Sequence, residues 1–132
     1  MAAITLLAEV AADLMSRDPM SLAATTAISE AARALTTRGC GAAVVIDPAG
    51  HPIGVVSQTD LLIHARGRGM NEDATPIGDV MTTAVFSVRS DTPVKSLIEH
   101  FRALNVNHLF VTDDAGILVG VISPLDVLRK LA

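Results

Sequence analysis

The stretch that decides the fold is Gly54-Val55-Val56-Ser57-Gln58-Thr59-Asp60, and its pattern occurs again as Gly120-Val121-Ile122-Ser123-Pro124-Leu125-Asp126. In both stretches a glycine and two β-branched residues precede a serine, and an aspartate follows three positions after that serine. The apolar part predicts the end of a buried strand. The Ser-x-x-Asp part is close to a capping box, which begins a helix. Each stretch therefore predicts a strand-to-helix junction.

The two junctions belong to an internal repeat with a shift of 66 residues,. Without a gap, Asp13-Leu14-Met15 aligns with Asp79-Val80-Met81, and the turn stretch Asp47–Gly50 aligns with Asp113–Gly116. A stretch containing Gly, Arg, Asn and Asp separates the copies and is typical of a linker. We expect an N-terminal helix and the first repeat in 1–66, a linker in 67–75 and the second repeat in 76–132.

Each repeat predicts the element order β-α-β-β-α, which is a mixed α/β (α+β) fold. In the second repeat Thr92 is the expected N-cap of the first helix, with Pro93 at its first position. Gly39 and Asn105 are expected to end the equivalent helices. An additional helix is expected over 4–14. The predicted strands are 20–22, 43–46, 53–56, 86–88, 109–112 and 118–122, and the predicted last helices are 59–65 and 125–131.

Composition excludes several classes of protein. Half of the 132 residues are apolar, but no apolar run reaches the roughly 18 residues that cross a membrane,. The net charge is −4 and the basic residues are scattered, so we expect no nucleic-acid partner,. A single cysteine, Cys40, and histidines without ligand spacing predict no disulfide and no metal site,. The N-terminus is a poor signal peptide, so a cytoplasmic chain is expected. The apolar excess favours a homodimer.

The junctions allow two interpretations. In the first, Ser57 with Asp60 and Ser123 with Asp126 only cap helices. In the second, the helix N-terminus and its hydroxyls contact a phosphate, while the carboxylate accepts hydrogen bonds from the two hydroxyls of a ribose. Spacing alone does not choose between them.

The ordered set of motifs resembles the CBS (cystathionine-β-synthase) domain family, and the tandem arrangement resembles a CBS pair, or Bateman module. The resemblance covers residues 13–131. Besides the two junctions and the Asp-Leu-Met and Asp-Val-Met entries, it rests on Thr92-Pro93-Val94 and on Asn107-His108-Leu109-Phe110-Val111.

This resemblance implies two repeats packed as a pseudo-two-fold pair, with an adenosyl ligand (AMP, ADP, ATP, S-adenosylmethionine or NAD) in the cleft between them. Asp60 and Asp126 would hold ribose, and the preceding hydroxyls of Ser57, Thr59 and Ser123 would contact ribose or phosphate. The implied first site combines Ser123, Asp126, Thr26, Ala31, Cys40 and Gly41. The implied second site combines Ser57, Thr59, Asp60, Thr92, Leu97, Val106 and Asn107, with His108 near phosphate. Leu125 and Ala42 depart from the pattern, so the two sites are expected to be unequal.

We therefore predict a ligand sensor that requires no cofactor and is not an enzyme. Ligand in the cleft would favour one arrangement of the repeats, which a protein partner reads. The alternative is a ligand-free structural or dimerisation module in which the Ser/Asp pairs only cap helices.

Overall fold

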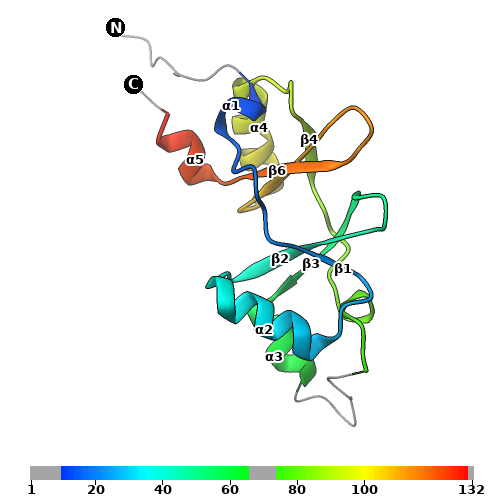
Figure 1. Ribbon diagram of the computed structural model, residues 1–132. Helices are drawn as coiled ribbons and strands as arrows, with labels where there is room; N and C mark the ends of the chain where they lie inside the picture. Colours follow the sequence, from blue (N-terminus) through cyan, green and yellow to red (C-terminus); the bar gives the residue numbers. More distant parts are fainter. Residues whose placement is uncertain (1–9, 66–73, 131–132) are drawn as a thin grey trace, which may run out of the picture. The chain divides into compact units, whose positions relative to one another are not determined.

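The structure is a computed structural model that describes residues 10–65 and 74–130 (Figure 1). The chain divides into two compact units, and each holds one three-stranded sheet. Met20–Val85 forms the β1–β3 unit. Met1–Pro19 and Phe86–Ala132 together form the β4–β6 unit. The predicted linker, 67–75, lies largely outside the described residues.

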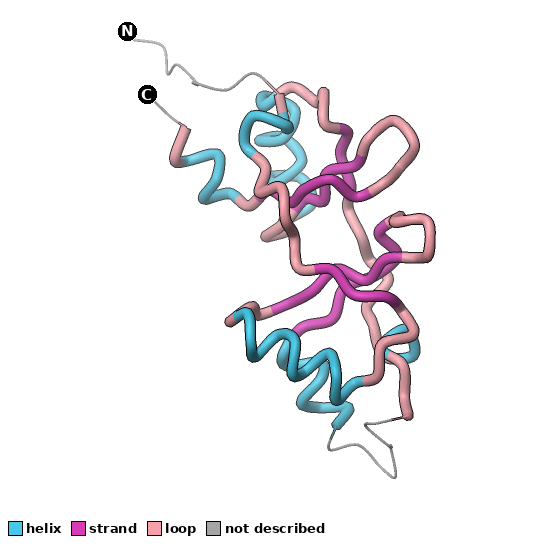
Figure 2. The backbone as a smooth tube through the Cα atoms, in the orientation of Figure 1, coloured by secondary structure: helices cyan, strands magenta, loops and turns pink. Residues whose placement is uncertain are grey.

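The element order confirms the predicted β-α-β-β-α pattern in both repeats (Figure 2). Two short helical segments, α1 (Ala11–Leu14) and the 3₁₀ turn η1 (Ile77–Asp79), precede them. The first repeat contains β1 (Ser21–Ala23), α2 (Ile28–Arg38), β2 (Ala42–Ile46), β3 (Pro52–Ser57) and α3 (Gln58–Ala65). The second contains β4 (Ser87–Arg89), α4 (Val94–Leu104), β5 (Leu109–Thr112), β6 (Leu118–Ile122) and α5 (Pro124–Leu128).

The two sheets have the same topology and the same register. In each, the first strand pairs in parallel with the second, and the second pairs antiparallel with the third. Val45 lies opposite Gly54, and Val111 lies opposite Gly120. The register shifts directly after Val45 and again directly after Val111. A shift of 66 residues therefore describes the backbone pairing as well as the sequence.

Each unit buries its own aliphatic core between the sheet and the helices. In the β1–β3 unit, α2 and α3 cover the same face of the sheet (Figure 1). Its core consists of Ile28, Ala31, Leu35, Ala43, Val45, Val56, Leu61 and Ile77. The core of the β4–β6 unit consists of Ala11, Leu14, Val88, Val94, Leu97, Leu109, Val111, Ile122 and Val127. Residues of β3 and β6 belong to these cores. The cores therefore fix the ends of both strands, where the two junctions begin.

Turns and helix ends follow the sequence closely. Asp47 and Asp113 begin equivalent turns, in which each Oδ1 accepts two backbone N–H groups. Gly39 and Asn105 end α2 and α4 in the left-handed region, with φ of 65° and 51°. Both helix ends confirm the prediction, because glycine and asparagine tolerate this conformation better than other residues do.

Three helix boundaries differ from the prediction. Thr92 is not the N-cap of α4: Pro93 takes that position with an extended ψ of 142°, and the Thr92 hydroxyl instead accepts the Arg89 N–H at 3.1 Å. The last helix of the second repeat ends at Leu128 rather than at 131, since its last turn is not α-helical. Of the helix predicted over 4–14, the described residues show only Ala11–Leu14.

The segments that lead into each repeat pack on the core of the other repeat. We define leading segment 1 as residues 10–19 and leading segment 2 as residues 74–85. Leading segment 1 joins the β4–β6 unit, where Ser16 and Val121 exchange backbone hydrogen bonds of 2.9 and 3.1 Å. Leading segment 2 joins the β1–β3 unit, where Thr82 and Val55 do the same at 2.9 and 2.8 Å. The compact units thus divide the chain differently from the repeat, because an isolated β-bridge joins each leading segment to the third strand of the other repeat. The boundaries 1–66 and 76–132 stay a prediction about the repeats.

This packing explains the glycine that begins each junction. A Cβ built on Gly54 would meet the side chain of Met81 and lie 3.0 Å from the carbonyl oxygen of Thr82. A Cβ on Gly120 would meet Met15 and lie 2.9 Å from the carbonyl oxygen of Ser16. Glycine thus allows a close approach of the leading segment to the third strand.

Candidate functional site

The first junction forms a complete capping box. The Ser57 N–H donates to Asp60 Oδ2 at 3.1 Å, and the Asp60 N–H donates to Ser57 Oγ at 3.1 Å. These two bonds satisfy backbone donors that the start of a helix leaves without a partner. The prediction that the serine and aspartate cap the helix is confirmed here.

The second junction forms the same box with two additional interactions. The Ser123 N–H donates to Asp126 Oδ2 at 2.7 Å, and the Asp126 N–H donates to Ser123 Oγ at 3.4 Å. The Ser123 hydroxyl itself donates to Asp126 Oδ2 at 3.1 Å. On the other side of the carboxylate, Arg129 lies 3.8 Å from Oδ1. Both oxygens of Asp126 therefore have a partner inside the unit.

The first junction keeps more of its polar groups available. Among residues 10–65 and 74–130, Asp60 Oδ1 and the hydroxyl proton of Ser57 have no hydrogen-bond partner. Both side chains are half-buried, and Thr59 between them is exposed. One carboxylate oxygen and two hydroxyls can therefore contact a ligand without breaking the cap. At the other junction, Leu125 stands at the position equivalent to Thr59, so the second hydroxyl is missing there.

The loop before β2 lies against the first junction. The Gln58 N–H donates to the Gly41 carbonyl oxygen at 2.9 Å, and the Gln58 side-chain amide donates to the Cys40 carbonyl oxygen at 2.9 Å. The structure thus brings Cys40 and Gly41 to the junction of their own repeat, whereas the resemblance combined them with Ser123 and Asp126. The sequence reasoning did not single out Gln58, and the one signal for it was that proline, which lacks an N–H, replaces it in the second repeat.

The other predicted residues are distributed over both units. Thr26 and Thr92 are half-buried at equivalent positions before α2 and α4, and their carbonyl oxygens accept the N–H groups of Ile77 and Ala11 at 2.8 Å. Before β5, Val106 is half-buried, while Asn107 and His108 are exposed. Each predicted site takes residues from both units, so its assembly stays a prediction.

Two residues expected beside the adenine base lie in the cores. Ala31 and Leu97 both have 0% of their surface exposed, each within the buried cluster of its own unit. Ala31 and Leu97 therefore offer no surface to a ligand in their own units. Their part in a base pocket stays a prediction.

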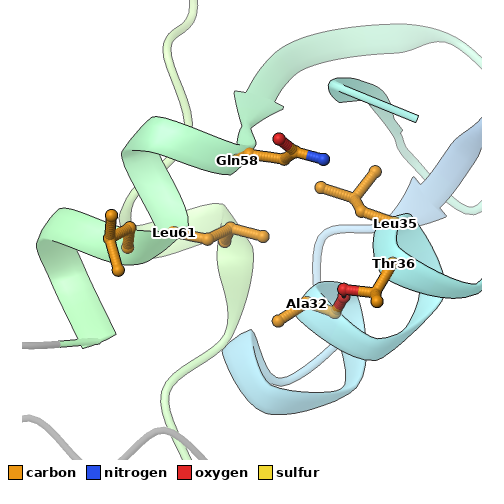
Figure 3. A pocket seen from close by; sticks show the side chains of 6 residues that line it. Ala32, Leu35, Thr36, Gln58 and Leu61 are labelled. Atoms are coloured by element: carbon orange, nitrogen blue, oxygen red, sulfur yellow. Dashed lines mark hydrogen bonds between the residues drawn. The ribbon is translucent and has the colours of Figure 1, made fainter. Parts of the chain in front are cut away.

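A hollow of about 430 Å³ lies between α2 and α3 on the helical side of the β1–β3 unit. Figure 3 shows Leu35, Thr36 and Ala32 of α2 facing Gln58 and Leu61 of α3 across it. Among residues 10–65 and 74–130, no charged side chain lines it. Its mainly apolar lining suits an aliphatic side chain.

The carboxyl group of Asp47, in the turn before β3, has a shifted pKa. The His51 N–H, which donates to Asp47 Oδ1 at 2.8 Å, is the main cause that lowers the pKa of Asp47. The His51 imidazole, 2.9 Å from Oδ2, lowers it further, and desolvation opposes both. In the second repeat, Ile117 takes the place of His51.

Comparison with known proteins agrees with this architecture. The family model of the CBS domain matches residues 10–67 and 77–132, so the chain belongs to the CBS domain family and carries two tandem CBS repeats. A solved structure of a CBS domain protein from Pyrobaculum aerophilum complexed with AMP superposes with a TM-score of 0.71. Its sequence is 31% identical, and the match covers 89% of this chain and 88% of that one.

Two curated relatives are longer proteins. An uncharacterised protein of Methanopyrus kandleri is 26% identical over 89% of this chain, which spans 60% of that protein's length. The gamma subunit of the 5′-AMP-activated protein kinase of Saccharomyces cerevisiae is 25% identical over 90% of this chain, which spans 39% of that subunit.

The described residues contain neither a membrane span nor a metal-binding cluster. No helix in 10–65 or 74–130 is long and apolar enough to cross a membrane. The same residues contain no cluster of three or more His, Cys, Asp or Glu side chains that could hold a metal ion.

Proposed function

We propose that the chain is a regulatory CBS pair that binds an adenosyl ligand and signals its presence to a protein partner. The Asp60 carboxylate would accept hydrogen bonds from the ribose hydroxyls through Oδ1, and Ser57 and Thr59 would contact ribose or phosphate. Residues of the other repeat would complete the base pocket, as the family resemblance implies. Ligand binding would then favour one arrangement of the two repeats.

The observation that carries this proposal is the difference between the two capping boxes. Asp60 caps α3 with Oδ2 alone, and Oδ1 has no partner among the described residues. The unpartnered oxygen can accept hydrogen bonds from ribose hydroxyls while Oδ2 keeps the cap, whereas both oxygens of Asp126 already have partners,. The AMP complex of the Pyrobaculum relative supports AMP as the first ligand to test.

The ligand class is tested by a thermal-shift panel of AMP, ADP, ATP, NAD, S-adenosylmethionine and GTP. A ligand at 100 times its dissociation constant stabilises the folded chain by about 2.7 kcal/mol. We expect adenosyl compounds to raise the melting temperature and GTP to leave it unchanged. If no adenosyl compound raises it at millimolar concentration, the ligand-free structural module is the better interpretation.

A catalytic role is tested separately. We propose that the chain regulates and does not catalyse, so incubation with ATP or S-adenosylmethionine followed by chromatography should return the ligand intact. Any product formed in proportion to the amount of protein would contradict this part of the proposal.

We also propose that the chain forms a homodimer through its helical faces. Four aliphatic side chains on the last helices are more than half exposed: Leu62 (62%), Ile63 (61%), Leu125 (51%) and Leu128 (60%). The apolar hollow between α2 and α3 adjoins Leu62. Such surface is typical of a protein interface. Light scattering on the chain and on the double variant Leu62→Glu/Leu128→Glu tests this proposal, and we expect a dimer that the variant converts to monomer.

A further inference from the structure

The two leading segments and their binding surfaces differ in side-chain size at equivalent positions. In the β4–β6 unit, the small Ala11 shares a buried cluster with the large Leu97. In the β1–β3 unit, the large Ile77 shares a buried cluster with the small Ala31. Residues 11 and 77 are equivalent under the 66-residue shift, and so are residues 31 and 97. The sizes are therefore inverted between the units.

This inversion matters because all four side chains are fully buried, each with 0% of its surface exposed. A protein core is packed densely, so an extra methylene group forces strain and a missing one leaves a cavity. Isoleucine against Leu97 would overfill the β4–β6 core. Alanine against Ala31 would leave the β1–β3 core underfilled.

A second position discriminates in the same direction. A Cβ built on Gly78 would lie 3.1 Å from the carbonyl oxygen of Ala24 and 3.2 Å from its Cβ, which is tighter than ordinary van der Waals contact. Leading segment 1 carries Ala12 at this position, and there the Ala12 N–H donates to the Ser90 carbonyl oxygen at 3.0 Å. Alanine at the position of Gly78 would therefore require Ala24 to shift by a few tenths of an ångström.

We propose that these complementary sizes direct each leading segment to the core of the other repeat. The alternative, in which each repeat keeps its own leading segment, would place Ala11 in the core that contains Ala31, and Ile77 in the core that contains Leu97. That arrangement combines a cavity in one unit with overpacking in the other. The two size combinations, Ala11 with Leu97 and Ile77 with Ala31, thus favour the exchanged arrangement of the leading segments. In this arrangement the chain passes from one unit to the other between Pro19 and Met20 and again between Val85 and Phe86.

The proposal is tested by a double-mutant cycle in the full chain. Ile77→Ala removes volume from the β1–β3 core and Ala31→Leu adds it, and the double variant recreates the Ala/Leu pair of the other unit. We expect each single variant to lower the melting temperature by several degrees and the double variant to recover at least half of the summed loss. Coupling of this kind is expected only between residues that share one core.

The matched control is Ala31→Leu combined with Leu109→Ala, which makes the same kinds of change in two different cores, since Leu109 is fully buried in the β4–β6 core. Its losses should add. If the Ile77→Ala/Ala31→Leu variant is no more stable than the sum of its single variants predicts, or no more stable than this control, the proposal is overturned. Should Ala31→Leu alone fail to fold, a folded double variant is itself the rescue, and an unfolded one contradicts the proposal.

Discussion

The β1–β3 and β4–β6 units have the same backbone arrangement, but different side chains surround their strand-to-helix junctions. Strand register, the register shift before the last residue of the second strand, the left-handed helix end and the capping box recur at a shift of 66 residues. At the junctions, however, Gln58-Thr59 in one unit stands where Pro124-Leu125 stands in the other. Asp60 retains an oxygen without a partner among the described residues, whereas Arg129 lies near the corresponding oxygen of Asp126.

The difference shows which residues the duplicated fold needs in both copies and which it leaves free to diverge. Gly54 and Gly120 are both required because a leading segment crosses close to each of them. The two residues inside each capping box do not contribute their side chains to the cap and can therefore differ. Divergence at those positions is what makes the two predicted sites unequal.

The largest expected effect comes from filling the glycine at the start of either junction. Gly54→Ala and Gly120→Ala place a methyl group within 3.0 and 2.9 Å of a backbone carbonyl oxygen, so we expect each to lower the free energy of unfolding by about 2 kcal/mol,. Urea denaturation measures this. Gly41→Ala is the matched control, because no atom lies within 4 Å of the place that its methyl group would take. Equal midpoints for all three variants would show that the leading segments do not pack as described.

A smaller effect distinguishes the two helix ends. Gly39 has φ of 65°, so Gly39→Ala should lower the free energy of unfolding by about 1 kcal/mol through backbone strain,. Asn105 has φ of 51°, and Asn105→Gly should leave stability equal or slightly higher,. Thermal unfolding of both variants checks this pair. A stabilising Gly39→Ala would contradict the left-handed helix end.

The smallest expected effect is on how stability depends on pH. It arises at the turn of the β1–β3 unit, where His51 contacts Asp47, whereas Ile117 stands at the equivalent position of the other unit. Because the folded state lowers the pKa of Asp47, its contribution to stability is present above the unfolded value near 3.9 and is lost as the pH falls through the folded pKa,. Asp47→Asn should therefore flatten the fall in melting temperature between about pH 5 and pH 2. His51→Ile, which supplies the residue found at position 117, should flatten it partly, because the backbone donor remains. If the melting temperature of Asp47→Asn falls with acid as steeply as that of the original chain, the Asp47 carboxyl group does not contribute to the fall.

The sequence predicted the fold in detail because its signals are local. Helix-ending Gly39 and Asn105, the turns at Asp47 and Asp113, and both capping boxes depend on residues a few positions apart. The exchange of leading segments was not predicted, because Asp13-Leu14-Met15 carries no local sign of which core it joins. Under the proposal above, that information lies in the sizes of Ala11 and Ile77 against Leu97 and Ala31 and in the difference between Ala12 and Gly78. Finding it requires knowing which residues share a core.

The candidate site was predictable in its chemistry but not in its grouping. Ser57 and Asp60 were found from their spacing, and the structure confirms their mutual hydrogen bonds. The contact of Gln58 with the Cys40 and Gly41 carbonyl oxygens depends on how α2 ends relative to β3, which no spacing in the sequence encodes. The same limit applies to the pocket of each predicted site, which combines residues from distant parts of the chain.

The measurement that tests the proposed function most directly is the affinity for AMP of the chain and of the variants Asp60→Asn and Asp126→Asn, by isothermal titration calorimetry. Asparagine keeps an oxygen for the cap, so both variants should stay folded, which thermal unfolding checks. We predict that the chain binds AMP and that Asp60→Asn weakens binding at least tenfold, a larger loss than Asp126→Asn causes. Unchanged AMP affinity in Asp60→Asn, with the fold intact, would contradict the assignment of this carboxylate to the ligand.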